Sequence, residues 1–256
     1  MTMQTITIIT HWFGGPLPAW YRLFLRTCEW NPTIRWLVVT DCDVPYKLTE
    51  NIKIVSMTLN ELTKRATTQT GYEFKAQSGY RVGDWRPAFG EIFEDLLHDA
   101  DFWGHCDPDV FFGNMREFLT EDILQAYDII SADTRMLCGA FTLYRNDHSI
   151  NQIYRGVPDF QQVLDGKFSP GFDELGMDRH LRKTDVCRVL RTALCSYSEV
   201  CSSVRCDATG LYLEGSRPAM AYHFRAVKDH LVMRCPDSAV SWVLQLNEII
   251  ESGAKA

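Results

Sequence analysis

"TITIITHWFGG", residues 5–15, alternates threonine with isoleucine and then enters a glycine-rich turn. This pattern is typical of a buried strand. Apolar residues at helical spacing follow in residues 18–31, and a second strand, "IRWLVVTD", ends at Asp41. A third strand is predicted over 51–57 and a helix over 59–66. Because strand and helix alternate, we expect parallel α/β units that form a Rossmann-like half.

The next buried strand lies in "DFWGHCDPDVFFGN", residues 101–114, and it ends at two aspartates, Asp107 and Asp109. Ligands of open α/β sheets bind outside the carboxyl ends of the strands, so this position favours a binding site. Two carboxylates two residues apart on a turn can converge on one hard divalent cation. Taken alone the pair is weak evidence, because aspartate is also favoured at ordinary turns.

The rest of the chain continues the mixed pattern. We expect a helix after Pro87 in residues 84–100, a helix and a short strand over 115–131, and a strand over 139–146. An acidic, glycine-bounded loop runs into a helix over 171–183, and a strand surrounds His223. Apolar residues at helical spacing predict a terminal amphipathic helix over 238–251.

Composition limits the class of protein. The 256 residues are 46% hydrophobic, enough for one sizeable core. The formal net charge is −7 and no dense basic tract occurs, so nucleic acid is excluded as an expected partner. The first residues lack the features of a signal peptide, and no stretch approaches the roughly 18–20 apolar residues of a membrane span. We therefore expect a soluble cytoplasmic protein.

The nine cysteines are scattered without a CxxC pair. We interpret them as reduced, mostly buried thiols, with a metal site as the alternative.

Four segments stand out in this order: residues 12–41, residues 84–119, "GAFTLYRN" and "FDE". The most specific part combines D-W-R-P, W-G-H-C-D-x-D and F-G-N within about thirty positions. Together the segments resemble a family of bacterial glycosyltransferases of GT-A type that occurs in gene clusters for capsule and O-antigen polysaccharides, and the resemblance covers roughly residues 8 to 175.

The resemblance implies a single GT-A-like domain over 1–256, a Rossmann-like mixed sheet flanked by helices. Residues 1–115, approximately, would bind the nucleotide and residues 116–256 the acceptor. Asp107 and Asp109 would chelate Mn²⁺ or Mg²⁺ together with the diphosphate of a nucleotide sugar, and Asp107 would also contact the donor. His223 would complete the metal site, although it could also be an ordinary strand histidine. His105 could lie in the second coordination shell and orient the residues that bind the metal.

Donor-binding candidates surround the acidic pair. Arg86, with Asp84, could face a diphosphate just before a helix start, or the two could form an ion pair that orients the helix. Asp41 could accept hydrogen bonds from a ribose or base.

The first strand closes with three further donor-binding candidates. These are His11, Trp12 and Phe13. Their side chains could form a wall for the nucleotide base or simply pack in the core.

Transfer of a sugar with inversion requires a general base on the acceptor side. The loop offers Asp173, Glu174 and Asp178, and the "FDE" match favours Asp173 or Glu174. One of these acids could instead serve as a helix cap. Gly139 would permit close approach of the backbone, and Arg145 or Asn146 could touch donor or acceptor, or the segment could be an ordinary strand and turn.

The expected activity is metal-dependent transfer of a hexose from a nucleotide diphosphate to a bacterial surface polysaccharide or lipid-linked glycan, with inversion. UDP is the expected nucleotide and galactose the favoured hexose. A lipid-linked acceptor would be met by peripheral docking at the inner face of the cytoplasmic membrane or through a partner protein. The alternatives are a non-catalytic nucleotide- or sugar-binding protein and a phosphatase of the haloacid-dehalogenase type. The phosphatase motif continues with Gly-Thr, where this chain has Val110 and Phe111.

Overall fold

The central element of the fold is a mixed sheet of seven strands, seen in a computed structural model that describes residues 3–158, 160–166, 171–234, 236, 239–245 and 248–252. Its strand order is β3-β2-β1-β4-β7-β6-β8. The first four strands in this order run parallel, whereas β7 is antiparallel to both of its neighbours and β8 is parallel to β6. The strands are β1 (Ile6–Trp12), β2 (Ile34–Thr40), β3 (Ile52–Ser56), β4 (Phe102–Cys106), β6 (Ile129–Ser131), β7 (Phe141–Arg145) and β8 (Val189–Arg191).

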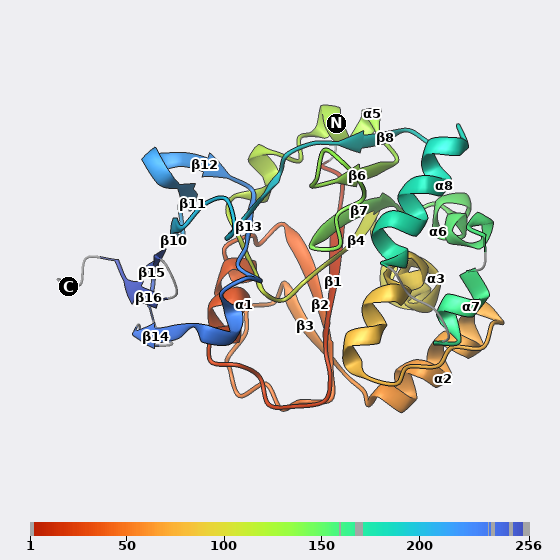
Figure 1. Ribbon diagram of the computed structural model, residues 1–256, viewed down its shortest axis with the longest axis horizontal. Helices are drawn as coiled ribbons and strands as arrows, with labels where there is room; N and C mark the ends of the chain where they lie inside the picture. Colours follow the sequence, from red (N-terminus) through yellow and green to blue (C-terminus); the bar gives the residue numbers. More distant parts are fainter. Residues whose placement is uncertain are drawn as a thin grey trace.

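Helices cover both faces of this sheet, with α1 on one side and α2, α3, α7 and α8 on the other (Figure 1). The predicted α/β class with a mixed, helix-flanked sheet is therefore confirmed. The α-helices are α1 (Tyr21–Glu29), α2 (Leu59–Thr70), α3 (Phe89–Ile92), α4 (Glu94–Leu97), α5 (Glu121–Ala126), α6 (His148–Asn151), α7 (Phe160–Leu164) and α8 (Met177–Lys183). The 3₁₀-helices are η1 (Gly79–Ala88), η2 (Met115–Glu117), η3 (Ile153–Gly156), η5 (Glu214–Ser216) and η6 (Lys228–His230), and η4 (Phe172–Gly176) is a π-helix.

Alternation along the buried strands builds two separate cores. Ile8 and Trp36 belong to the core that contains α1, whereas Ile9 and Leu37 belong to the core that contains α2. Side chains of adjacent strand residues point to opposite faces, so a strand that is apolar throughout can fill both layers. This is why the strand segments are almost continuously hydrophobic.

Local sequence signals fix the ends of α2. Thr58 and Glu61 form a capping box at its start, and Gly71 ends it with a φ of 77°. That conformation favours glycine, and the cap supplies the hydrogen bonds that the last turn lacks.

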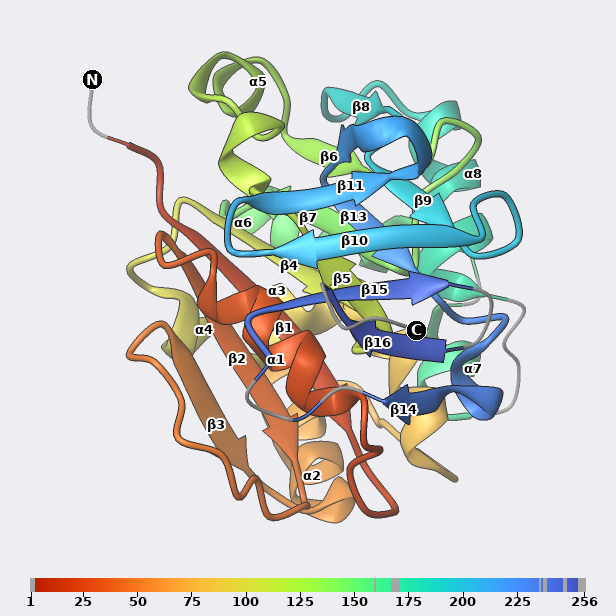
Figure 2. The ribbon, with the colours of Figure 1, turned by 90° about the vertical axis from the view of Figure 1, so that its left-hand side faces the viewer.

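The C-terminal part adds two smaller sheets. One contains β5 (Val110–Phe112), β13 (Ala221–His223) and β9 (Cys195–Tyr197), with β13 in the centre. The other lies in front of α1 in Figure 2 and has the order β12-β11-β10-β15-β16-β14. Its strands are β10 (Ser203–Asp207), β11 (Gly210–Leu213), β12 (Arg217–Ala219), β14 (Val232–Arg234), β15 (Ser241–Gln245) and β16 (Glu248–Glu251).

The predicted terminal helix over 238–251 is wrong, because the described residues of this segment form the antiparallel strands β15 and β16. Trp242, Leu244 and Ile249 are buried, while Ser241 and Val243 are less so. The ring of Trp242 stacks on Trp30 at the end of α1, at a centroid distance of 5.0 Å. Pairing of β15 with β10 and this packing decide the conformation, which the local pattern of apolar residues left ambiguous.

No disulfide involves the eight described cysteines, and six of them are buried. Among the described residues, no helix combines the length and hydrophobicity that a membrane crossing requires.

Trp242→Ala should lower the free energy of unfolding by about 3–5 kcal/mol, because it removes a fully buried ring from the contact between α1 and the C-terminal sheet. Urea denaturation followed by tryptophan fluorescence measures this loss. Val240→Ala, at a side chain that is 68% exposed on the same segment, is the matched control and should change stability by less than about 0.5 kcal/mol. Equal, small effects of both variants would contradict the packing described above.

Candidate functional site

A cavity of about 540 Å³ opens at the carboxyl ends of β1 and β4. These two strands are parallel neighbours, so the residues that end them meet at one edge of the sheet. Most of the site residues predicted from the sequence line this cavity. They are His11, Trp12, Phe13, Asp84, Arg86, Asp107, Asp109, Asp173, Glu174 and His223.

Asp41 is one of the candidates that the structure does not bring to the cavity. It lies at the end of β2, exposed, and its Oδ1 accepts a hydrogen bond from the Gly14 amide at 3.3 Å. With Cys42, Asp43 and Tyr46 it lines a separate surface hollow. The turn after β1 thus separates Asp41 from the cavity, a displacement that no local pattern indicates.

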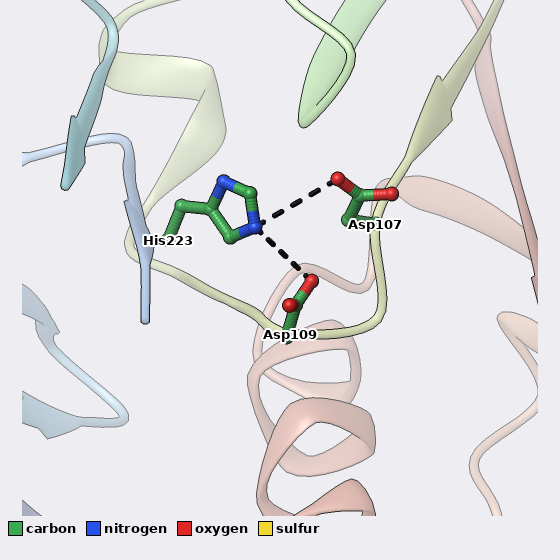
Figure 3. A group of neighbouring side chains, drawn as sticks. All are labelled: Asp107, Asp109 and His223. Carbon is green, nitrogen blue, oxygen red and sulfur yellow. Dashed lines mark hydrogen bonds and ion pairs between the residues drawn. The ribbon is translucent and has the colours of Figure 1, made fainter. Parts of the chain in front are cut away.

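Asp107, Asp109 and His223 form a group that could hold a metal ion. Each offers a ligand atom within 4.8 Å of the others. Figure 3 shows the two aspartates on the loop that follows β4 and the imidazole Nε2 of His223 facing both carboxylates. The distances from Nε2 are 3.2 Å to Asp109 Oδ1 and 3.7 Å to Asp107 Oδ2. Two carboxylates and one imidazole suit a divalent cation.

Backbone pairing brings His223 to the aspartates across more than a hundred positions of sequence. In the pairing of β13 with β5, His223 stands opposite Val110, the residue after Asp109. The Phe224 amide then donates to the Asp109 carbonyl oxygen at 3.1 Å. The ladder therefore determines the position of the histidine.

Asp109 is buried and compensated by two bases. Besides His223, the Lys228 ammonium contacts its Oδ2 at 2.6 Å. Burial by itself raises the pKa of Asp109, but the hydrogen bond with His223 and the nearby Lys228 charge outweigh burial and hold this pKa well below its usual range. Asp109 therefore stays ionised, as a metal ligand must be.

Arg86 connects the acidic pair to the opposite wall of the cavity. Its guanidinium forms ion pairs with Asp107 and with Asp173 Oδ2, the latter at 3.1 Å, and donates to the Gly139 carbonyl oxygen at 2.9 Å. We expected Arg86 just before a helix start, but it lies within η1. Asp84 contacts Arg81 at 3.4 Å. The planar guanidinium can hold two carboxylates at once because its donors form a rigid fork.

The two candidate bases occupy different environments on η4. Asp173 is buried against Arg86, whereas Glu174 is only partly buried and accepts a hydrogen bond from the Gly139 amide at 3.0 Å. Burial raises the pKa of Asp173 to about 7, although Arg86 opposes this effect. Asp178, the third acid of the loop, is fixed by Arg182 and Arg191 at 2.6 and 2.7 Å and does not line the cavity.

The residues at the end of β1 form one side of the cavity. Burial and the Arg86 charge lower the pKa of His11 to about 3, so its imidazole is neutral. Trp12 packs edge-on against Trp20 and Tyr21, with centroids 5.9 and 6.0 Å away. Trp12 thus contributes to packing as well as to the cavity wall.

His105 is fully buried and does not line the cavity. Burial, together with the charge of Arg86, lowers its pKa well below the usual range.

The two ends of β7 differ in role. Gly139 precedes the strand and lines the cavity, whereas Arg145 is its last residue and Asn146 follows it. Arg145 pairs with Asp128 at 3.0 Å, and the Asn146 amide donates to two backbone carbonyls at 2.9 Å. Because β7 runs antiparallel to β4, its carboxyl end lies at the opposite edge of the sheet. The expectation that Arg145 or Asn146 touches a ligand in this cavity is therefore wrong.

Sequence reasoning missed several residues of the cavity. Lys228 and Arg225 follow His223 closely and bring two cations to the site, while Tyr80, Arg81 and Tyr197 line other parts. The sequence signal that could have indicated Lys228 and Arg225 is that they closely follow His223 in the chain.

The fold and this site define an α/β protein with a two-carboxylate, one-histidine centre in a cavity that both acidic and cationic side chains line. The chain belongs to the family described as a family of unknown function, DUF6625, whose model matches residues 8–225. No curated protein matches the chain.

Replacing Asp173 tests the electrostatics of this site through the pH dependence of stability. Because the pKa of Asp173 is raised from 3.8 to about 7, its carboxyl group binds a proton more tightly in the folded protein than in the unfolded chain between these two pH values. The contribution of Asp173 to the free energy of unfolding therefore falls as the pH rises through this window. The stability of Asp173→Asn relative to wild type should rise from pH 4 to pH 7 by on the order of 2 kcal/mol, as one pKa unit corresponds to about 1.4 kcal/mol.

Urea denaturation of both proteins across this pH range gives the difference. The matched control Asp185→Asn, at an exposed position, should show a difference that is flat with pH. A falling relative stability of Asp173→Asn would mean that the ion pair with Arg86 outweighs burial.

Proposed function

We propose that the protein is a metal-dependent glycosyltransferase of GT-A type that moves a hexose from a nucleotide diphosphate to a glycan acceptor with inversion. The observation that carries the proposal is the metal-capable group Asp107, Asp109 and His223 on the wall of a cavity that also contains four cationic side chains. These are Arg81, Arg86, Arg225 and Lys228. A nucleotide sugar has the matching chemistry, since it carries a diphosphate that binds both metal and cations.

The donor set fits a hard divalent cation. Oxygen ligands from the two aspartates suit Mn²⁺ or Mg²⁺, which retain open positions for phosphate oxygens. A bound cation would stabilise the negative charge that develops on the diphosphate leaving group.

The cationic side chains would act on the same leaving group. Lys228 already neutralises Asp109 at 2.6 Å, and Arg86 lies between Asp107 and Asp173. Both would lower the electrostatic cost of bringing a diphosphate next to two carboxylates. The neutral His11 with Phe13 would form a surface for the nucleotide or sugar without adding charge.

The arrangement of strands is compatible with a nucleotide-binding half over residues 1–115 and an acceptor-binding half over residues 116–256. The parallel strands β1 to β4 lie within 1–115, while His223, Glu174 and Lys228 come from 116–256. A donor site between the halves would use ligands from both. UDP is the proposed nucleotide and galactose the favoured hexose, with a bacterial surface polysaccharide or a lipid-linked glycan at the inner face of the cytoplasmic membrane as acceptor.

Nucleotide binding should depend on metal and on Asp109. Saturating UDP with Mn²⁺ should raise the Tm of the wild-type protein by about 5–10 °C, because ligand binding stabilises the folded state by about 3 kcal/mol at a hundredfold excess over Kd. Asp109→Asn keeps the size of the side chain but removes the charge, so it should lose at least three quarters of this rise. Thermal denaturation and calorimetry with UDP, GDP, CMP and their sugar conjugates, with and without Mn²⁺, measure the effect.

The control Asp185→Asn should behave like wild type. Nucleotide binding that is indifferent to metal and to Asp109, or no binding of any nucleotide, would refute the metal-dependent donor site. Metal-dependent binding without turnover of any nucleotide sugar would favour the non-catalytic binding protein, and release of phosphate from simple monoesters would favour the phosphatase.

A further inference from the structure

We infer that Glu174 is the general base that takes the proton from the attacking hydroxyl group, and that Asp173 instead holds Arg86 in place. This division of roles rests on the proposed function. The sequence alone presents the two acids as equivalent, because they are adjacent and both match the same short motif.

Asp173 is already engaged as the partner of a buried cation. Its Oδ2 lies 3.1 Å from Arg86 Nη1, and its side chain is 8% exposed. Arg86 has its other ion pair with Asp107, so loss of Asp173 would remove one of the two carboxylates that position this guanidinium. The contact with Arg86 and the burial of the side chain leave an acceptor hydroxyl group less access to Asp173 than to a partly buried neighbour.

Glu174 has the opposite properties. Its side chain lines the cavity and is only partly buried, so a hydroxyl group could reach it. One oxygen, Oε1, accepts from the Gly139 amide at 3.0 Å, and its second oxygen, Oε2, has no hydrogen bond to the described residues. A base needs this combination of one oriented oxygen and one available oxygen.

The backbone places Glu174 next to the metal-capable group. The Asp107 amide donates to the Ala140 carbonyl oxygen at 3.2 Å, and the preceding residue, Gly139, donates its amide to Glu174. The base and the acidic pair are thus attached to adjacent positions of the same segment. A hydroxyl group bound at Glu174 would lie beside the proposed sugar donor.

The proposed step balances without any further reactant. The acceptor hydroxyl proton moves to Glu174 Oε2 while the hydroxyl oxygen forms a bond to the anomeric carbon. The bond between that carbon and the diphosphate oxygen breaks, and its electron pair leaves with the nucleoside diphosphate. Glu174 later returns its proton to water.

Gly139 is a positioning residue for this base. A Cβ atom at this position would lie 2.8 Å from Glu174 Oε1 and 3.2 Å from its Cδ, and 3.3 Å from Asp173 Oδ2, so Glu174 is the side chain that it meets most closely. The backbone of Gly139 has no positive φ, and the nearest colliding atoms belong to the end of a flexible side chain. Gly139→Ala should therefore displace Glu174 at little cost in stability.

Hydrolysis of UDP-galactose and UDP-glucose with Mn²⁺, followed as UDP release, tests the assignment with water as the acceptor. Glu174→Gln retains an oxygen that can accept from Gly139 and removes only the basic group. We expect its kcat to fall about a hundredfold or more, with the Kd for UDP and the KM for the UDP-sugar within threefold of wild type. Gly139→Ala should reproduce this loss of kcat, whereas Asp173→Asn should raise KM and Kd because Arg86 loses a partner.

The matched controls are Glu50→Gln, at an exposed position, and Gly15→Ala, whose added Cβ would meet nothing within 4 Å. Both should match wild type. If Glu174→Gln keeps kcat within fivefold of wild type, or if Asp173→Asn alone abolishes kcat at unchanged KM, the assignment is overturned while the donor site stands. A wild-type protein that binds UDP without turning over either sugar also overturns it. A wild-type protein that binds no nucleotide refutes the proposed function, and the assignment fails with it.

Discussion

The site depends on one buried guanidinium. Arg86 forms ion pairs with Asp107, on the loop after β4, and with Asp173, on η4, and it donates to the backbone at Gly139. These three partners come from distant parts of the sequence, and all of them border the cavity. A buried charge without partners would be very costly, so the arginine and the two carboxylates require one another. Their mutual requirement holds the acidic loop and the η4 turn in fixed positions.

Asp109, the second residue of the acidic pair, has partners of its own. His223 and Lys228 both face Asp109, and both belong to the chain that begins at β13. The charge on the two aspartates is therefore divided between an arginine of the N-terminal half and bases of the C-terminal half. A divalent cation bound here could balance the two carboxylates and leave Arg86 and Lys228 to contact an anionic ligand. Under the proposed function, that ligand would be a diphosphate bound together with the metal.

The mixed direction of the sheet separates functional from structural residues. Parallel β1 and β4 direct their carboxyl ends to the cavity, and His11 and Asp107 follow from that direction. The antiparallel β7 brings its beginning, with Gly139, to the same edge and carries Arg145 away from it. Arg145 and Asp128 form an ion pair at the far edge instead. Residues of one short motif, "GAFTLYRN", thus serve the site at one end and the scaffold at the other.

Much of this protein follows from its sequence, because local patterns report local structure. The patterns in residues 5–15 and 34–41 predicted the buried strands, the pattern in residues 59–66 predicted the helix α2, and the position of Asp107 and Asp109 after β4 predicted a site at the strand ends. Tertiary structure alone decided the rest. The β5–β13 ladder brought His223 to Asp109, packing of Trp242 on Trp30 turned the expected terminal helix into strands, and Arg86 distinguished Asp173 from Glu174. These outcomes depend on contacts between residues far apart in the chain, and their free energies cannot be read from the neighbours of any one residue.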